Sequence, residues 1–412
     1  MKYYSIPAIN EKSLQYHRII HMELHKKINI LIINYEFPPL GGGGGVATYD
    51  LALEWVKVAN VHIITSSFKG LPPYEYINGI HVHRVKILFR KSRDAATFIS
   101  MFSYLPAGFI RALSLFKKYK FDIINTHFVV PSGPLGYVLS KLFKIPNVLS
   151  LHGGDIYDPS KKFSPHRNRF FKLIVQYLLN KADAIIAQSS NTRNNAFHYY
   201  KIKKDIGIIP LAFHPPVIPK SSRKLLGLHE KDFICITIGR LIKRKAIDVL
   251  IKAIARINNQ HVKLIIMGDG PEREYLEQLV QELALENIVT FLGFVSDDKK
   301  YAYLSVSDLF VLTSLHEGFG IVFMEAMYCG LPIVTTNSGG QVDFLENEHN
   351  ALLIDVGDIQ KCAECIMRFK NDKKLYAQCS KNNKARITAY YAENVAKQYM
   401  DIFYQLVDMN EN

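Results

Sequence analysis

The sequence has 412 residues, which is more than one ordinary globular core accommodates and predicts two domains. Its composition, 48% hydrophobic and 21% charged, fits a folded α/β protein and excludes wholesale disorder. Five cysteines in so long a chain do not form a disulfide framework and indicate a reducing compartment. Cys362 and Cys365 lack a second cysteine pair or nearby histidines, so we interpret them as two positions on one helix rather than as a zinc or redox site.

The net charge of +14 lies entirely in the first half of the chain. Residues 1–210 hold 28 Lys and Arg against 12 Asp and Glu, whereas residues 211–412 hold 23 against 25. Such an excess is either a solvated basic surface or an attraction to phosphates, carried by an acidic small molecule or by an anionic leaflet. We expect no nucleic-acid partner, because no nucleic-acid motif accompanies the charge.

Residues 1–26 form an N-terminal extension that is polar and aromatic, without the apolar core of a secretory signal. The most membrane-like stretch, Phe98 to Phe116, contains Pro106 and Arg111, which disfavours a transmembrane span. We therefore expect the protein in the cytoplasm, either free or peripheral on the inner face of a membrane.

Residues 27–210 alternate short apolar runs with helical segments, which is typical of a parallel sheet with crossover helices. We expect strands at Ile28–Asn34, Val61–Thr65, Ile80–Val85, Asp122–Thr126, Asn147–Leu151 and Ala184–Gln188. We expect helices at Ala47–Ala59, Gly108–Tyr119 and Phe170–Lys181. This segment therefore predicts a first Rossmann-like domain.

Residues 211–220 interrupt the alternation with three prolines, which resist both helix and central strand and predict a linker. The alternation restarts in residues 221–385, which predict a second Rossmann-like domain. Its expected strands are Phe233–Ile238, Lys263–Met267, Val289–Leu292, Leu309–Thr313, Pro332–Thr335 and Ala351–Ile354. Its expected helices are Ile247–Asn258, Glu272–Leu283 and Ile321–Cys329. Residues 386–412 predict a last helix, from Glu393 onward, that packs back toward the first domain.

This order predicts two doubly wound α/β domains facing across a cleft, whose ligands bind beyond the carboxyl ends of the strands. The glycine run 41–45 follows the first predicted strand and opens onto a helix. Gly44 and Gly45 let the backbone approach a ligand, and a helix start favours an anion, although a merely flexible loop is the alternative. The second strand runs into Thr65 and Ser66 rather than an acidic residue, which disfavours NAD.

Two cations follow the strand Phe233–Ile238 just before a helix. Arg240 and Lys245 suit a diphosphate, because the arginine fork binds oxygens directionally and lysine adds a compact charge. An isolated pair of this kind is more often plain surface charge.

The most specific pattern is residues 317–325, which read EGFGIVFME and open a helix after the strand Leu309–Thr313. Glycines at 318 and 320 free the backbone, so that the amides at the helix start can face a phosphate or another polar ligand. Glu325, one to two turns further along, can accept hydrogen bonds from two vicinal hydroxyls. Glu317 can reach a second group on the same ligand.

With these motifs the chain resembles the family 4 glycosyltransferases, retaining enzymes of the GT-B architecture, over roughly residues 27–385. Glu317 and Glu325 match the family's E-x7-E motif, and the segment from Gly239 to Lys245 matches G-R-L-x-x-x-K. Gly44 and Gly45 match its N-terminal glycine loop, and the turn at Gly268 is similar to the family's turn beside the nucleotide. Ala246 departs from the usual glycine and Asp343 from the frequent glutamate.

The resemblance implies that a nucleotide-diphosphate sugar is the co-substrate and that neither a cofactor nor a metal ion takes part. It also implies that residues 221–385 form the donor-nucleotide domain and residues 27–210 the acceptor domain. No Asp-x-Asp occurs in the sequence, in agreement with cations of the protein replacing a divalent ion. Arg240 and Lys245 would neutralise the leaving diphosphate, and Glu325 would bind the ribose. Glu317 would hold the donor sugar together with the amides of Phe319, Gly320, Ile321 and Val322.

Two histidines follow predicted strands of the first domain. His152, in LHGGD, is similar to the family's His-Gly segment, and we predict that it hydrogen-bonds a donor hydroxyl or orients the acceptor. For His127 a structural role is the better interpretation.

Together these features predict a retaining, metal-independent hexosyltransferase of cell-surface polysaccharide or glycolipid assembly. Its acceptor would be a glycan, a glycolipid or a small molecule. Two alternatives stay open: a nucleotide-sugar epimerase of the same fold, and a non-catalytic nucleotide-binding protein.

Overall fold

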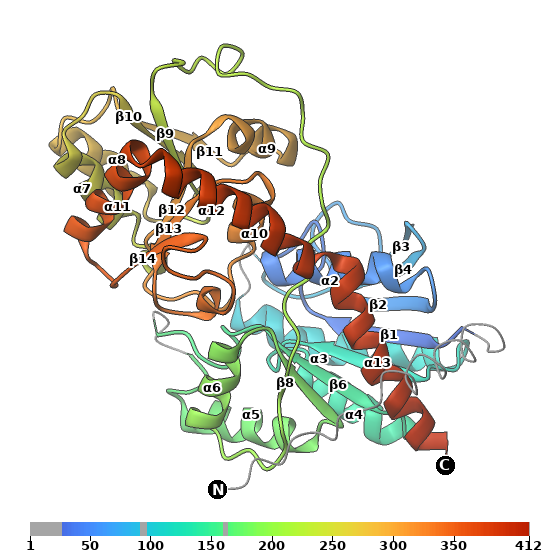
Figure 1. Cartoon of the computed structure of the whole chain (residues 1–412). Helices are drawn as coiled ribbons and strands as arrows, with labels where there is room; N and C mark the ends of the chain where they lie inside the picture. The colour runs from blue at the N-terminus through green and yellow to red at the C-terminus, as the bar shows by residue number, and fades with distance from the viewer. Residues whose placement is uncertain (1–26, 91–96, 160–163, 412) are drawn as a thin grey trace, which may run out of the picture.

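The computed structural model describes residues 27–90, 97–159 and 164–411, so the predicted N-terminal extension lies outside the described part of the chain. The described residues form two α/β units, each built on a largely parallel sheet (Figure 1). This arrangement confirms the predicted fold class.

The first unit alternates strands and helices along the chain. Its strands are β1 (Asn29–Asn34), β2 (Asn60–Ser66), β3 (Tyr74–Ile77), β4 (Ile80–Val85), β5 (Ile123–His127), β6 (Asn147–Leu151), β7 (Ala184–Ala187) and β8 (Gly207–Ile208). Its helices are α2 (Gly43–Trp55), α3 (Phe98–Phe116), α4 (Gly133–Phe143), α5 (Arg169–Lys181) and α6 (Ser190–Tyr199). The described strands pair in the order β3-β4-β2-β1-β5-β6-β7-β8, and β3 is antiparallel to β4.

The second unit repeats this plan with a smaller sheet. Its strands are β9 (Phe233–Ile238), β10 (Val262–Met267), β11 (Val289–Gly293), β12 (Leu309–Leu312), β13 (Ile333–Thr336) and β14 (Ala351–Ile354). Its helices are α7 (Ile247–Ile257), α8 (Arg273–Glu282), α9 (Asp297–Val306), α10 (Ile321–Tyr328), α11 (Ile359–Asn371) and α12 (Lys373–Arg386), with short 3₁₀ turns η1 (Lys243–Lys245), η2 (Gly340–Asp343) and η3 (Ile387–Tyr390). The described strands pair in the order β11-β10-β9-β12-β13-β14.

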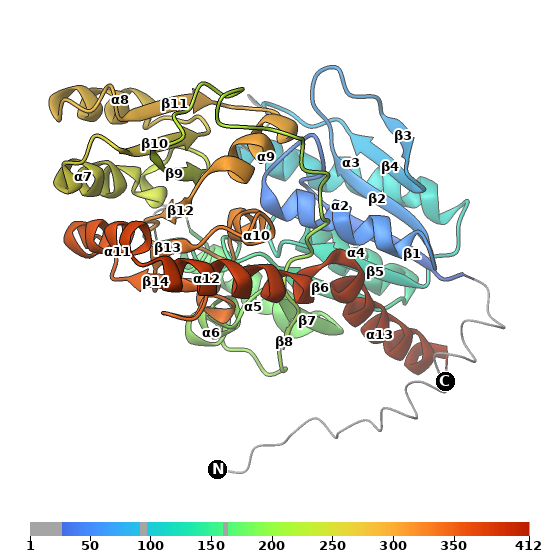
Figure 2. The same ribbon diagram turned by 45° about the horizontal axis from the view of Figure 1, so that its top comes forward.

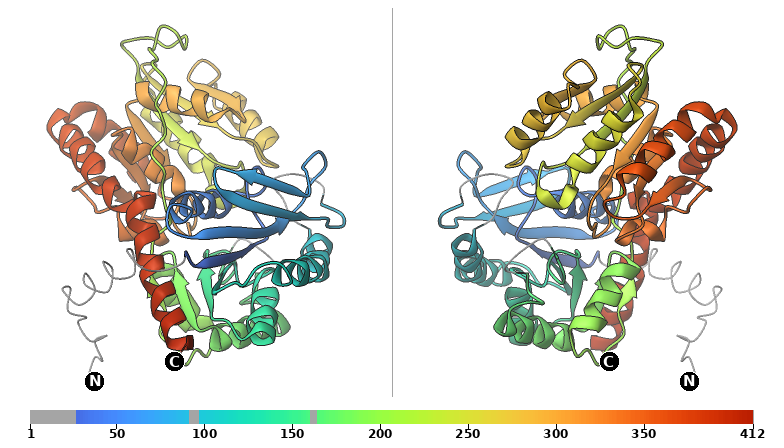
Figure 3. Two further views of the ribbon diagram at one scale, coloured as in Figure 1. Left: turned by 90° about the vertical axis from the view of Figure 1, so that its right-hand side faces the viewer. Right: turned by 90° about the vertical axis from the view of Figure 1, so that its left-hand side faces the viewer.

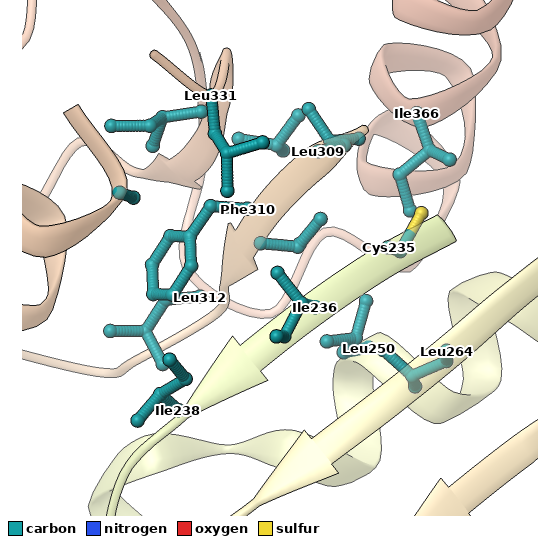
Figure 4. Packing of buried hydrophobic residues seen from close by; sticks show 14 of the residues in the cluster. Cys235, Ile236, Ile238, Leu250, Leu264, Leu309, Phe310, Leu312, Leu331 and Ile366 are labelled. Carbon is teal, nitrogen blue, oxygen red and sulfur yellow. The ribbon is translucent and has the colours of Figure 1, made fainter. Parts of the chain in front are cut away.

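Strand β1 shows why the sheets form, because its side chains are buried on both faces. Ile30 and Ile32 pack with α2 and the C-terminal helix α13 (Ala392–Glu411), whereas Leu31 and Ile33 face α3 and α4. The centre of the second sheet is equally apolar, with Ile236 of β9 beside Phe310 of β12 (Figure 4). Such double burial requires the continuous apolar runs from which the strands were predicted.

The chain crosses between the two units twice, and the two crossings pair with each other. The Phe213 amide donates to the Tyr390 carbonyl at 2.9 Å, and the Ala392 amide donates to the Phe213 carbonyl at 2.9 Å. After the second crossing, α13 runs along the first unit (Figures 2 and 3). There the ring of Trp55 on α2 meets Phe403 with ring centroids 5.1 Å apart, and its Nε1 donates to the Ala396 carbonyl.

Helix α3 begins ten residues before the predicted start at Gly108, because Pro106 lies inside the helix rather than ending it. Thr97 caps the helix, and its hydroxyl accepts a hydrogen bond from the Ser100 amide. Among the described helices α3 is the one long and apolar enough to cross a membrane by length and composition.

Candidate active site

A cavity of about 310 Å³ lies between the two units. Its walls come from residues that follow β1 and β5 in one sheet and β9 and β12 in the other. At these strands the order reverses in each sheet, which is where open α/β sheets bind ligands. Eight of the twelve predicted site residues line this cavity: Gly44, His152, Lys245, Glu317, Phe319, Gly320, Ile321 and Val322.

Glu317 is buried at the floor of the cavity between two cations. Its Oε1 accepts a hydrogen bond from Lys245 Nζ at 2.8 Å, and its Oε2 lies 3.3 Å from Arg244 Nη1. Burial alone would raise the pKa of Glu317, but Lys245 and Arg244 outweigh it and lower this pKa to about 2. The carboxylate is therefore held ionised, and both cations are held in place at the cavity wall.

Glu325 is buried about one turn after the start of α10 at Ile321, and it does not line the cavity. Its Oε1 accepts a hydrogen bond from Lys300 Nζ of α9 at 2.6 Å. Burial raises the pKa of Glu325, and Lys300 offsets only part of that effect. The two glutamates of the motif thus have pKa values shifted in opposite directions, because one is paired with two cations and the other with one.

Three further predicted residues lie outside the cavity lining. Arg240 is exposed, Gly45 lies one residue beyond the lining glycine Gly44, and Gly268 packs against the backbone of Gly239. A Cβ on Gly268 would lie 1.9 Å from the Gly239 carbonyl oxygen, so the close approach of two loops accounts for this glycine. Donor-binding roles for these residues remain predictions.

Arg244 also lines the cavity, although it is not among the predicted site residues. Its Nη1 donates to the His316 carbonyl at 2.6 Å, which aims the guanidinium at Glu317. Three consecutive cations, Lys243 to Lys245, follow β9, and this run was the signal that a second cation reaches the site.

Two helix starts meet at the cavity, one from each unit. Gly43 and Gly44 open α2, and Ile321 and Val322 open α10, and all four residues line the cavity. A Cβ on Gly44 would lie 2.6 Å from the ring of Phe128, so only glycine fits there. The free amides and dipoles of two helix starts favour an anion in the space between them.

A chain of hydrogen bonds fixes the tautomer of His152. Asn125 Nδ2 donates to the Val148 carbonyl, so Asn125 Oδ1 accepts from His127 Nε2 at 2.6 Å. His127 Nδ1 is then the acceptor for His152 Nε2 at 2.9 Å. His152 Nδ1 is left as a buried lone pair without a partner among the described residues.

Burial lowers the pKa of His152 to about 3, so its imidazole is neutral at physiological pH. A neutral ring whose Nδ1 carries a lone pair can accept a hydrogen bond, and the role predicted for His152 toward a ligand hydroxyl remains a prediction. His127 is fully buried and positions His152, which agrees with the structural role predicted for it.

The two units touch directly beside the cavity. The hydroxyl of Ser189 donates to the Gly318 carbonyl at 2.9 Å, and the Ser190 amide donates to Asp343 Oδ2 at 2.6 Å. Asp343, the departure from the family pattern, therefore caps the start of α6 in the other unit, where the helix dipole favours a carboxylate.

Comparison with known proteins identifies the family. The model of glycosyl transferases group 1 matches residues 220–386, and that of glycosyltransferase family 4 matches residues 41–215. The chain belongs to glycosyltransferase family 4. It is a glycosyltransferase that uses nucleotide sugars. This assignment disfavours both the epimerase and the non-catalytic binding protein.

Relatives and solved structures agree with this assignment. The N-acetyl-alpha-D-glucosaminyl L-malate synthase of Bacillus anthracis is 27% identical over 91% of this chain and 97% of its own length. The alpha-monoglucosyldiacylglycerol synthase of Acholeplasma laidlawii is 23% identical over 71% and 78%. The sucrose-phosphate synthase of Thermosynechococcus elongatus superposes with a TM-score of 0.82 at 23% identity, over 93% of this chain and 100% of that one. Anabaena HepE in complex with UDP and glucose gives 0.74 at 23%, over 92% and 100%, and these structures confirm the GT-B fold.

Proposed function

We propose that this glycosyltransferase is retaining and metal-independent, and that it transfers a hexose to a hydroxyl of a lipid-linked or phosphorylated acceptor in surface polysaccharide or glycolipid assembly. The observation that carries the proposal is the joint presence of Lys245, Arg244 and two helix starts around one cavity.

A diphosphate fits this set of groups. Cleavage of the donor leaves negative charge on the diphosphate, and preorganised cations and amides lower the barrier where that charge develops. Lys245 and Arg244 supply positive charge at the place where a divalent ion would otherwise act. This supports transfer without a metal ion, with the second unit holding most of the donor.

The donor sugar would lie toward His152 and Glu317. His152 Nδ1 would accept a hydrogen bond from a sugar hydroxyl, and the Glu317 carboxylate would accept another. Because Glu317 is already held by two cations, it is a poor nucleophile, which supports front-side transfer over a covalent enzyme intermediate. In that reaction the bond from the anomeric carbon to the diphosphate breaks, the acceptor oxygen bonds on the same face, and its proton passes to the leaving diphosphate.

The acceptor class follows from the charge of the first unit and from the relatives. Residues 1–210 carry the whole positive excess, which favours an acceptor with phosphate or one held at an anionic surface. One relative is named for a diacylglycerol glycolipid and another for L-malate, so acceptors in this family are diverse.

The test begins with a thermal-shift screen of nucleotide sugars, starting with UDP-sugars because the HepE structure contains UDP. With the selected donor, transfer is measured with and without EDTA, and the anomeric configuration of the product is read by NMR. Equal rates and a retained configuration are expected. An inverted product or complete loss with EDTA would refute the proposed mechanism.

Variants then assign the cations. Glu317→Ala and Arg240→Ala are each expected to reduce transfer by orders of magnitude without unfolding the protein. Arg244→Ala is the matched comparison, because Arg244 lines the cavity and Arg240 does not. Normal transfer by Arg240→Ala together with inactive Arg244→Ala would move the diphosphate role from Arg240 to Arg244.

A further inference from the structure

One face of the first unit is apolar where a water-exposed surface is normally polar. Helices α3, α4 and α5 lie side by side over one side of the sheet, opposite α2 and α13 (Figures 1 and 2). We call their outer surface the docking face. Its exposed large apolar residues are Phe98, Ile99, Phe102 and Ile110 on α3, Val138 and Leu142 on α4, and Phe170, Leu173 and Tyr177 on α5.

The exposure follows the helical period, so it is a property of whole helix faces rather than of isolated side chains. On α3 the outward positions 99, 102, 106 and 110 are all apolar, and Ile110 is 69% exposed. On α5 the outward positions 170, 173 and 177 are aromatic or aliphatic, and Phe170 is 66% exposed. The rings of Phe98 and Phe171 lie 6.2 Å apart and join the two helices. An exposed apolar patch over three helices marks an interaction surface.

The charge on the same segments is of one sign. Residues 97–121, 128–154 and 164–182, which contain the three helices, hold ten Lys and Arg and no Asp or Glu. Arg169 and Lys172 flank Phe170 on α5, and Lys141 and Lys144 lie at the end of α4. Apolar side chains bordered by cations fit an interface with anionic headgroups above hydrocarbon.

A groove between α4 and α5 adds a second feature of this kind. It has a volume of about 1150 Å³, and its walls include Val138, Leu173 and Tyr177. Lys181, Lys203 and Lys204 also line it. An apolar groove with lysines in its lining has room for a hydrocarbon chain and a negative group beside it.

We propose that the docking face binds the surface of an anionic phospholipid leaflet. A second copy of the chain is a poorer occupant, because the same face would bring like charges together. The starts of α4 and α5 follow β5 and β6, whose carboxyl ends carry His127 and His152, so a leaflet on this face lies toward the His152 side of the cavity. This inference rests on the surface alone and not on the proposed reaction.

The test is sedimentation of the full chain with vesicles, without substrate. Wild type is expected to bind mixed phosphatidylcholine–phosphatidylglycerol vesicles, to bind pure phosphatidylcholine weakly, and to lose binding at high salt. Phe102→Ser with Phe170→Ser should weaken partition at least tenfold, whereas Phe294→Ser, 87% exposed on the other unit, should not.

Charge variants complete the design. Arg169→Gln with Lys172→Gln should weaken partition by about 30-fold, since each lost cation near the surface contributes about fivefold. The double variant Lys224→Gln with Lys231→Gln removes two exposed cations of the other unit and should bind like wild type.

A UDP-induced thermal shift in every variant shows that the fold and the nucleotide site are intact, which separates this inference from the proposed function. Wild-type binding by either docking-face variant would overturn the inference, as would partition that ignores lipid charge. Sedimentation velocity that shows only a self-associated form, lost in these variants without lipid binding, would assign the face to a second copy instead.

Discussion

Glu317→Gln tests whether this carboxylate neutralises the two cations of the cavity. With a folded pKa of about 2 against an ordinary 4.5, the ionised carboxylate stabilises the fold by about 3 kcal/mol at neutral pH. Glutamine removes that charge and leaves Lys245 and Arg244 without their counter-ion. The variant should therefore lose about 3 kcal/mol of unfolding free energy, or a little over 1 M in urea midpoint for a slope of about 2.5 kcal/mol per M.

The pH dependence gives the sharper criterion. Because the folded pKa is lowered, the contribution is fully present above pH 4.5 and is lost as the pH falls toward 2, so that less than half of it is left at pH 3. Urea unfolding followed by circular dichroism at pH 7 and pH 3 measures it. Glu282→Gln, an exposed change on α8, is the control. The nucleoside diphosphate of the donor selected by the thermal-shift screen should stabilise Glu317→Gln at least as much as wild type, because its diphosphate replaces the lost charge.

A Glu317→Gln protein as stable as wild type at pH 7 would refute this account of the site. An equal deficit in Glu282→Gln would do the same.

Three further predictions follow from single residues. Burial raises the pKa of Asp50 to about 7, so the Asp50 carboxyl destabilises the fold increasingly as the pH rises from about 4 to 7. Asp50→Asn should therefore be more stable than wild type at pH 8 by up to about 4 kcal/mol and equally stable near pH 4. Fluorescence of the single tryptophan during urea unfolding measures this difference. Gly44→Ala should reduce the affinity for the nucleotide sugar selected by the thermal-shift screen at least tenfold in calorimetry, whereas Gly42→Ala, with no heavy atom within 4 Å of its Cβ, should not. Ala246 has a left-handed φ of 45°, so Ala246→Gly should raise the urea midpoint by the equivalent of about 1 kcal/mol; a lower midpoint would show that the strain is absent.

The buried strands could be predicted from the sequence because their residues are apolar on both faces. Strand β9 spans the predicted residues Phe233–Ile238, and β1 begins one residue after its predicted start. Helices α6 and α9 were not predicted, because their sequences are polar and lack a continuous apolar stripe. The first half of α3 was missed for a different reason: a proline on an exposed helix face costs one backbone hydrogen bond but does not end the helix here.

The glycine loop and the 317–322 segment could also be predicted, because a ligand-facing backbone requires glycine after a strand. The hydrogen-bond and ion-pair partners of the charged groups could not be predicted from the sequence. Glu325 pairs with Lys300, which lies on another helix and whose position depends on tertiary packing. The choice between Arg240 and Arg244 depends on the turn at η1, which directs only Arg244 toward Glu317. The tautomer of His152 depends on Asn125, which accepts a hydrogen bond from His127 and so sets the tautomer of the ring that His152 contacts.

The contact between the two units places favourable and unfavourable charges at two parts of one interface. Asp343 caps α6 across the interface and stabilises the contact, whereas Asp50 is buried and lies near the negative charges of Asp297 and Glu325 of the second unit. Ionisation of Asp50 therefore destabilises the contact, which brings both helix starts to one cavity. A proton on Asp50 and a donor bound at this cavity should both stabilise the contact, so by linkage each should strengthen the binding of the other. Donor affinity should consequently rise as the pH falls through about 7, and Asp50→Asn should remove that dependence.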